Sequence, residues 1–185
     1  MRALPCLSIL AVAAALAACG GSLQALAGKA PELPESQKPP RAVPVRLHAA
    51  AKLNVDAQGR PLALVARVYK LRQNAAFEQA PYSAFLSPSA EKEAFGADVV
   101  EVKDLTLVPG QRYEVVEKVT REAGYIGVVA LFHSPAPQRW RLAFAAPEAE
   151  KAGLTVGLHA CALSAGAGAK PTVVEVKTLA SARCQ

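Results

Sequence analysis

The 185-residue chain has few of the residues that usually build an enzyme site or a ligand platform. It contains one Trp, four Tyr, five Phe and three His, and its single Met is the first residue. It has no Gly-x-Ser-x-Gly nucleophile elbow, no Gly-rich phosphate loop and no His-Glu-x-x-His zinc motif. Glu114 and Glu117 lie three apart in a predicted strand, so they point to opposite faces and do not form a carboxylate pair. The sequence therefore predicts no catalytic residue, no metal and no small-molecule substrate.

Runs of like charge are also missing. The net charge is +6, but the basic residues are scattered along the chain. A nucleic-acid-binding surface usually clusters its Lys and Arg residues, so we expect no nucleic-acid partner. A scattered positive surface is typical of solubility, or of attraction to an acidic protein or to lipid headgroups.

The long apolar run of a membrane-spanning helix is absent from the N-terminus. Residues 7–18 are apolar or small, which is roughly a dozen positions, whereas a bilayer span needs about 20. With Arg2 before it, this run predicts an export signal over residues 1–18. The segment Leu16-Ala17-Ala18-Cys19 then matches a lipobox, in which two small residues precede a cysteine that accepts diacylglycerol.

Cleavage before Cys19 would make it the lipid-bearing first residue of the mature chain. The covalent lipid is then the only attached group we expect, with no other cofactor. Gly20, in place of the Asp that retains lipoproteins in the inner membrane, favours the outer membrane, with the domain facing the periplasm. An ordinary secretory signal with an incidental cysteine is the alternative.

Two cysteines besides Cys19 remain after cleavage, Cys161 and Cys184. The periplasm is oxidising, so the pair favours a disulfide over two free thiols. His159 would share a strand face with Cys161, but a blue-copper site usually also needs a Met ligand. We therefore expect His159 to be a polar-face residue beside a disulfide cysteine.

Residues 19–42 are rich in proline and predict a lipidated N-terminus followed by an extended tether. Residues 43–185 form one predicted domain with the alternating pattern of half-buried strands. The predicted strands are 43–53, 62–71, 99–108, 111–119, 125–132, 140–144, 154–160 and 172–179. Regularly spaced strands of this kind indicate a β-sandwich of about seven to eight strands.

One region breaks the strand pattern. Ser87 is a candidate N-cap, Pro88 fits the first helical position and Gly96 is a candidate stop, so residues 87–96 predict a short helix. A second helical segment is expected over residues 77–86, interrupted or begun at Pro81.

Several blocks, taken in order behind the lipobox, resemble the type VI secretion system outer-membrane lipoprotein family, called TssJ or VasD. The blocks are Leu53-Asn54-Val55-Asp56-Ala57-Gln58-Gly59-Arg60-Pro61-Leu62, Val65-Ala66-Arg67-Val68-Tyr69-Lys70-Leu71, Phe77-Glu78-Gln79-Ala80, Phe95-Gly96-Ala97-Asp98, Leu107-Val108-Pro109-Gly110, Tyr125-Ile126-Gly127-Val128-Val129-Ala130-Leu131-Phe132 and Trp140-Arg141. Each block alone is unspecific, but the ordered set covers residues 43 to 160.

The resemblance implies an all-β, transthyretin-like β-sandwich with one or two short inserted helices. It implies a non-enzymatic subunit of the trans-envelope secretion complex that binds the periplasmic part of the inner-membrane protein TssM. In the family, the loop between the first two strands contributes to that contact. Here the loop predicts partner contacts by Asn54, Val55, Asp56, Ala57, Gln58, Gly59 and Arg60.

Two other functions stay open from the residues alone. A periplasmic carrier would bind a small ligand or glycan in a groove of the sandwich, on exposed aromatic side chains. A pilotin-like lipoprotein would escort an outer-membrane pore to its place. The carrier is less favoured, because most of the few aromatic residues fall on apolar strand faces.

Overall fold

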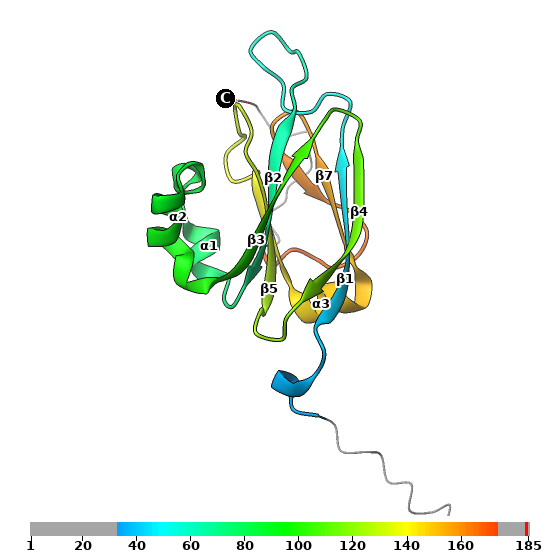
Figure 1. Cartoon of the computed structure of the whole chain (residues 1–185). Coiled ribbons are helices and arrows are strands. Elements are labelled where there is room, and N and C mark those ends of the chain that lie inside the picture. Colours follow the sequence, from blue (N-terminus) through cyan, green and yellow to red (C-terminus); the bar gives the residue numbers. More distant parts are fainter. Residues whose placement is uncertain (1–32, 174–183, 185) are drawn as a thin grey trace, which may run out of the picture. The chain divides into compact units, whose positions relative to one another are not determined.

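The computed structural model describes residues 33–173 and Cys184. The predicted signal peptide, Cys19, the tether as far as residue 32 and residues 174–179 of the predicted last strand lie outside the described residues. Within the described part, two four-stranded sheets form a sandwich with short helices (Figure 1). The expected all-β sandwich is therefore confirmed. None of the helices in residues 33–173 has the length and hydropathy needed to cross a bilayer.

The described elements follow one another along the chain. The strands are β1 (Arg41–Ala49), β2 (Leu64–Leu71), β3 (Val99–Leu107), β4 (Arg112–Val119), β5 (Tyr125–Ala130), β6 (Arg141–Ala145), β7 (Leu154–Leu158) and β8 (Leu163–Ala165). The helices are α1 (Ala75–Gln79), α2 (Pro88–Phe95) and α3 (Ala146–Ala152), with 3-10 turns η2 (Glu35–Gln37), η3 (Tyr82–Leu86) and η4 (Gly96–Asp98).

The two sheets have the strand orders β4-β1-β7-β8, here called the β1 sheet, and β3-β2-β5-β6, here called the β2 sheet. β1 lies inside its sheet, antiparallel to β4 and parallel to β7. Its alternating sequence sets the two faces of the strand. Val43, Val45 and Leu47 are fully buried, whereas Pro44 and Arg46 between them are partly exposed.

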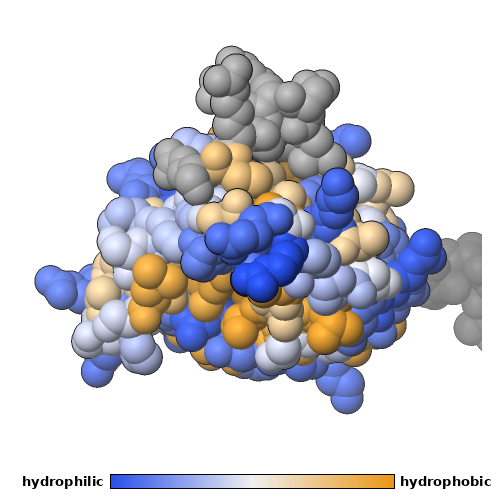
Figure 2. Space-filling view, turned by 90° about the horizontal axis from the view of Figure 1, so that it is seen from above, coloured by the Kyte–Doolittle hydropathy of each residue, from blue (hydrophilic) through white to orange (hydrophobic). Residues whose placement is uncertain are grey.

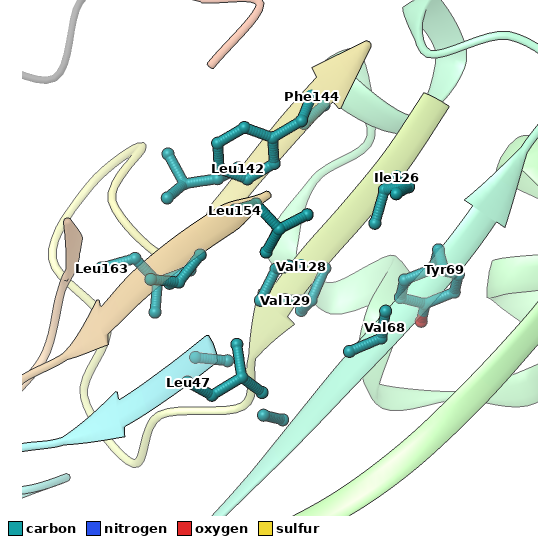
Figure 3. Packing of buried hydrophobic residues seen from close by; sticks show 14 of the residues in the cluster. Leu47, Val68, Tyr69, Ile126, Val128, Val129, Leu142, Phe144, Leu154 and Leu163 are labelled. Carbon is teal, nitrogen blue, oxygen red and sulfur yellow. The ribbon is translucent and has the colours of Figure 1, made fainter. Parts of the chain in front are cut away.

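Side chains from both sheets fill one hydrophobic core (Figure 3). Leu47 and Leu154 come from the β1 sheet, and Val68, Val128 and Leu142 come from the β2 sheet. β5 is buried from its second residue to its last, as the continuous apolar run predicted for a strand covered on both faces.

The segment between β2 and β3 forms α1, η3 and α2, which lie beside the β2 sheet (Figure 1). Tyr69 of β2 contacts three rings of this segment, with centroid distances of 5.4 Å to Phe77, 6.1 Å to Phe85 and 5.8 Å to Phe95. The hydroxyl of Tyr69 donates a hydrogen bond of 3.0 Å to Glu91 of α2, and burial raises the pKa of Tyr69. The aromatic cluster thus fixes the inserted helices on the sheet.

Several predicted strands end earlier than the apolar pattern indicated. β1 ends at Ala49 and not at Leu53, because Ala51 and Lys52 form a turn. Leu53 is nevertheless fully buried, which explains why the apolar alternation continues beyond the strand. β5 ends at Ala130, two residues before the predicted end at Phe132.

Three local features differ from the sequence prediction. Neither α3 nor the three-residue strand β8 was predicted. The helix expected over residues 87–96 is α2, but Gly96 has φ −59° and the chain continues into η4. Gly96 is therefore not the left-handed stop that its position indicated.

Candidate partner-binding loop

The loop between β1 and β2 spans residues 50–63 and begins with a buried anchor. Leu53 is fully buried, and its carbonyl accepts a hydrogen bond of 3.0 Å from the backbone N–H of Leu62. This bond closes the loop at its base, so residues 54–61 project beyond the strand ends. In Figure 1 the loop lies at the end of the sandwich opposite α3.

Asn54 ties the loop base to other parts of the chain. Its Nδ2 donates a hydrogen bond of 2.8 Å to the carbonyl of Ala63, and its Oδ1 accepts one of 2.7 Å from the N–H of His133. Its backbone N–H donates to the carbonyl of His159 at 3.1 Å. Asn54 has φ +47° and is 5 % exposed. Asn tolerates this left-handed conformation better than most residues.

Asp56 organises the loop from within. Its Oδ1 accepts hydrogen bonds of 2.9 Å from the backbone N–H groups of Gln58 and Arg60, and its Oδ2 accepts one of 2.7 Å from Arg60 Nε. Hydrogen bonds from Arg60, led by that from its backbone N–H, hold the pKa of Asp56 below its ordinary value. Gly59 supplies the positive φ of +74° that the turn needs. The loop is therefore ordered by its own polar groups.

The structure places the seven predicted contact residues in two groups. Ala57, Gln58, Gly59 and Arg60 are exposed at the loop tip, with the Arg60 side chain 74 % exposed. Val55 and Asp56 are partly exposed, and Asn54 is buried. The sequence prediction of contacts from Asn54 onward does not fit the place of Asn54, whose amide group is used inside the domain.

A disulfide lies next to the loop base. Cys161 is 3 % exposed and is bonded to Cys184. The preceding residue, Ala160, accepts a hydrogen bond of 3.0 Å from the N–H of Val55. The disulfide therefore fixes the C-terminal end of the chain close to the segment that carries the loop.

The predicted His159-x-Cys161 pair does not form one face of a strand. β7 ends at Leu158, so both residues lie beyond the strand. Burial lowers the pKa of His159, whose Nε2 lies 2.8 Å from Ser164 Oγ. Among residues 33–173 and Cys184, no group of three or more His, Cys, Asp or Glu side chains is arranged to hold a metal ion.

At the end of β1 that lies away from the loop, a network of charged groups surrounds the chain where it enters the strand. Arg121 Nε donates a hydrogen bond of 2.7 Å to the carbonyl of Pro39, and its guanidinium pairs with Glu150 of α3 at 3.2 Å. Arg41, at 6 % exposure, donates to the carbonyl of Ala123 at 3.2 Å. The residues just before β1 are thus fixed to the domain. The tether side and the loop lie at opposite ends of β1.

Residues 41–161 match the type VI secretion lipoprotein family, described as VasD, EvfM and TssJ. The chain belongs to this family. The predicted family is therefore confirmed, and with it the assignment as a lipoprotein subunit of the secretion system and not an enzyme. No curated protein sequence gives a match.

Solved structures of type VI secretion components share the fold. The lipoprotein TssJ1 from Pseudomonas aeruginosa is 28 % identical with a TM-score of 0.62, over 72 % of this chain and 100 % of that chain. A chain of a structure described as the type VI membrane complex is 26 % identical with a TM-score of 0.62, over 68 % of this chain and 98 % of that chain. A chain of a structure described as the TssM C-terminal domain (869–1107) from EAEC is 26 % identical with a TM-score of 0.60, over the same shares.

Proposed function

We propose that this TssJ-family lipoprotein ties the type VI secretion membrane complex to the outer membrane. Its lipid at Cys19 holds the membrane, and the loop at residues 55–60 binds the periplasmic part of TssM. The observation that carries the proposal is the family match together with the position of tether and loop at the two ends of β1. The likeness to chains from structures described by TssM and by the membrane complex supports TssM as the partner.

The order within the loop supports a binding role. A loop that is already held by Asp56 and by Asn54 loses little conformational freedom when a partner binds. The exposed Arg60 retains guanidinium donors beyond the Nε that Asp56 engages, and Arg is enriched at interface hot spots. The structure therefore favours Arg60 and Gln58 as contacts and Asn54 as their support.

The aromatic residues count against the carrier alternative. Tyr69, Phe77, Phe85 and Phe144 are fully buried in the core. A surface hollow of about 410 Å³ has Phe77 in its lining, but that ring belongs to the aromatic cluster beneath. A ligand or glycan platform would present its rings at the surface.

The lipid anchor is tested by replacing Cys19 with Ser and following the protein in membrane fractions. We expect the variant to leave the outer-membrane fraction, because one substituted atom removes the thiol that carries the lipid. Cys6→Ser makes the same change inside the predicted signal segment and should leave fractionation unchanged. Retention of Cys19→Ser with the outer membrane would contradict the anchor.

The loop is tested by calorimetric titration of the mature chain, made soluble by Cys19→Ser, with the purified periplasmic part of TssM. Arg60→Glu reverses a charge at the loop tip and should weaken binding by at least about tenfold. Lys118→Glu makes the same charge reversal at an exposed position, near the end of β4 that lies away from the loop. It should change the affinity by less than about twofold. Equal affinities for the two variants would remove the loop from the interface.

A further inference from the structure

Two of the exposed large hydrophobic side chains lie at the same end of the domain as the loop. Leu62, which follows the loop tip, is 36 % exposed, and Val108, between β3 and β4, is 52 % exposed. The pairing of Leu64 with Leu107 in the β2 sheet makes Val108 the neighbour of Ala63 across the two chain segments. Leu62 and Val108 therefore lie on adjacent segments. Single exposed apolar residues are common, so Val108 gains its significance from its fixed position beside the loop.

The turn that carries Val108 is rigid. Gln111 N–H donates to the carbonyl of Val108 at 3.1 Å, and Gly110 has φ +80°, as a type II turn with Pro109 before glycine requires. The side chain of Gln111 closes the turn a second time, because its Oε1 accepts a hydrogen bond of 2.9 Å from the N–H of Val108.

The turn and the loop are joined through the end of β1. The N–H of Gly110 donates to the carbonyl of Ala50 at 3.2 Å, and the N–H of Ala49 donates to the carbonyl of Gln111 at 2.9 Å. Ala50 is also the first residue of the loop. The turn therefore keeps a fixed position relative to the loop, and both can present side chains to one partner.

The chemistry of this end is mixed. In Figure 2, which looks down on it, hydrophobic patches lie beside a strongly hydrophilic surface. Arg60 and Gln58 supply the polar groups of the loop tip, and Leu62 and Val108 supply apolar area. An apolar centre next to an arginine is the arrangement that protein interfaces favour.

We propose that the turn at residues 108–111 is a second part of the TssM-binding surface, with the exposed Val108 as its apolar centre. This inference rests on the proposed function. The partner segment that fits presents an apolar side chain to Val108. It also presents a carboxylate to the guanidinium of Arg60, whose Nε is already bonded to Asp56.

The test compares two exposed valines in the mature chain carrying Cys19→Ser. Val108→Glu places a charge in the proposed apolar centre and should weaken binding to the periplasmic part of TssM by at least about tenfold. Val116→Glu makes the same change at a valine of β4 that is 59 % exposed and should alter the affinity by less than about twofold. Thermal unfolding of both variants checks the fold, and Val108→Ser, a smaller change, replaces Val108→Glu if that variant unfolds.

The outcomes separate the inference from the function beneath it. If Arg60→Glu weakens binding while Val108→Glu and Val108→Ser bind like the parent chain, the turn is not part of the surface and the proposed function stands. If the parent chain itself does not bind TssM, both fail. If Val116→Glu weakens binding as much as Val108→Glu, the effect is a general one of added charge and the inference is wrong.

Discussion

The backbone N–H of His133 donates a hydrogen bond of 2.7 Å to Oδ1 of Asn54, which lies 79 positions earlier in the chain. The same side chain donates through Nδ2 to the carbonyl of Ala63. Asn54 therefore joins the two ends of the loop and holds both to the segment after β5. The loop geometry depends on this buried amide as much as on the residues at the tip.

Replacing Asn54 separates two contributions to loop stability. Asn54→Ala removes both hydrogen bonds and puts alanine at φ +47°, so we expect the free energy of unfolding to fall by about 2–4 kcal/mol. Asn54→Gly also removes the bonds but accepts the positive φ, so its loss should be smaller by about 1 kcal/mol. Denaturant unfolding followed by the fluorescence of Trp140 measures both. Equal losses would mean that the backbone conformation contributes nothing.

The sequence predicted the loop's local turn but not the burial of Asn54. The turn formers Asp56 and Gly59 predicted an ordered polar loop, because their bonds are made within a few residues. The burial of Asn54 depends on His133 and Ala63, whose positions are set by folding. A sequence pattern carries no signal for such a bond, so Asn54 was predicted as a contact residue.

A buried ion pair bridges the two sheets at the β3–β4 edge. Lys70 of β2 is 5 % exposed, and its Nζ lies 2.8 Å from Glu101 and 3.7 Å from Glu117 of β4. Glu117, at 8 % exposure, also accepts a hydrogen bond of 2.8 Å from Lys103 and raises the pKa of that lysine. Charges that point inward at an edge hinder pairing with another strand.

Removing one partner of the Lys70–Glu117 ion pair should lower the free energy of unfolding more than replacing both partners. Glu117→Leu leaves the Lys70 ammonium buried with one partner fewer, so we expect unfolding free energy to fall by about 3 kcal/mol. The double variant Lys70→Met/Glu117→Leu also removes the Lys70 ammonium, so no buried charge has lost its partner. Most of the loss in unfolding free energy should then disappear. A double-mutant cycle from denaturant unfolding gives the coupling. Additive losses would show that the two groups do not interact.

His159 predicts a pH dependence of stability. Burial lowers its pKa from the ordinary 6.5, so the folded chain holds the neutral ring where the unfolded chain already binds a proton. Stability that is present above pH 6.5 is therefore lost as the pH falls through that value towards the lower folded pKa. Unfolding measured at several pH values between about 5 and 7.5 should show a smaller slope for His159→Gln than for the parent chain. Identical slopes would exclude His159 as the cause.

The strands and helices themselves differ in the same way: some follow from local sequence signals, and others depend on contacts made in the folded chain. The alternation of Val43, Val45 and Leu47 and the Pro109-Gly110 turn predicted β1 and the β3–β4 connection, because both signals are local. β8 has three residues, too few for a periodic pattern, and depends on pairing with β7. α3 was missed although it carries signals: Pro147 lies in its first turn, and Gly153 ends it with φ +67°.

If the lipid and the loop are the two attachment points, tension between them passes along β1. The residues just before β1 are held by Arg121, which donates to the carbonyl of Pro39, and by Arg41, which pairs with Glu35, and the loop begins directly after the strand. β1 is paired on both sides, with β4 and β7. A pull along the strand loads these hydrogen bonds together, because the bonds to β4 run perpendicular to the strand direction and those to β7 cross it at a slant.

This geometry predicts a direction-dependent mechanical strength. Handles on Ser36→Cys and Gln58→Cys, in the chain with Cys19→Ser, pull along β1 and load its pairings in shear. Handles on Gln58→Cys and Arg112→Cys pull apart the C-terminal end of β1 and the N-terminal end of β4, which lie together in the antiparallel pair. They therefore break that pairing one bond at a time. Optical-trap extension should give a clearly higher unfolding force for the first pair. Equal forces would mean that β1 does not resist the load in shear, and the tie would have to carry tension through other contacts.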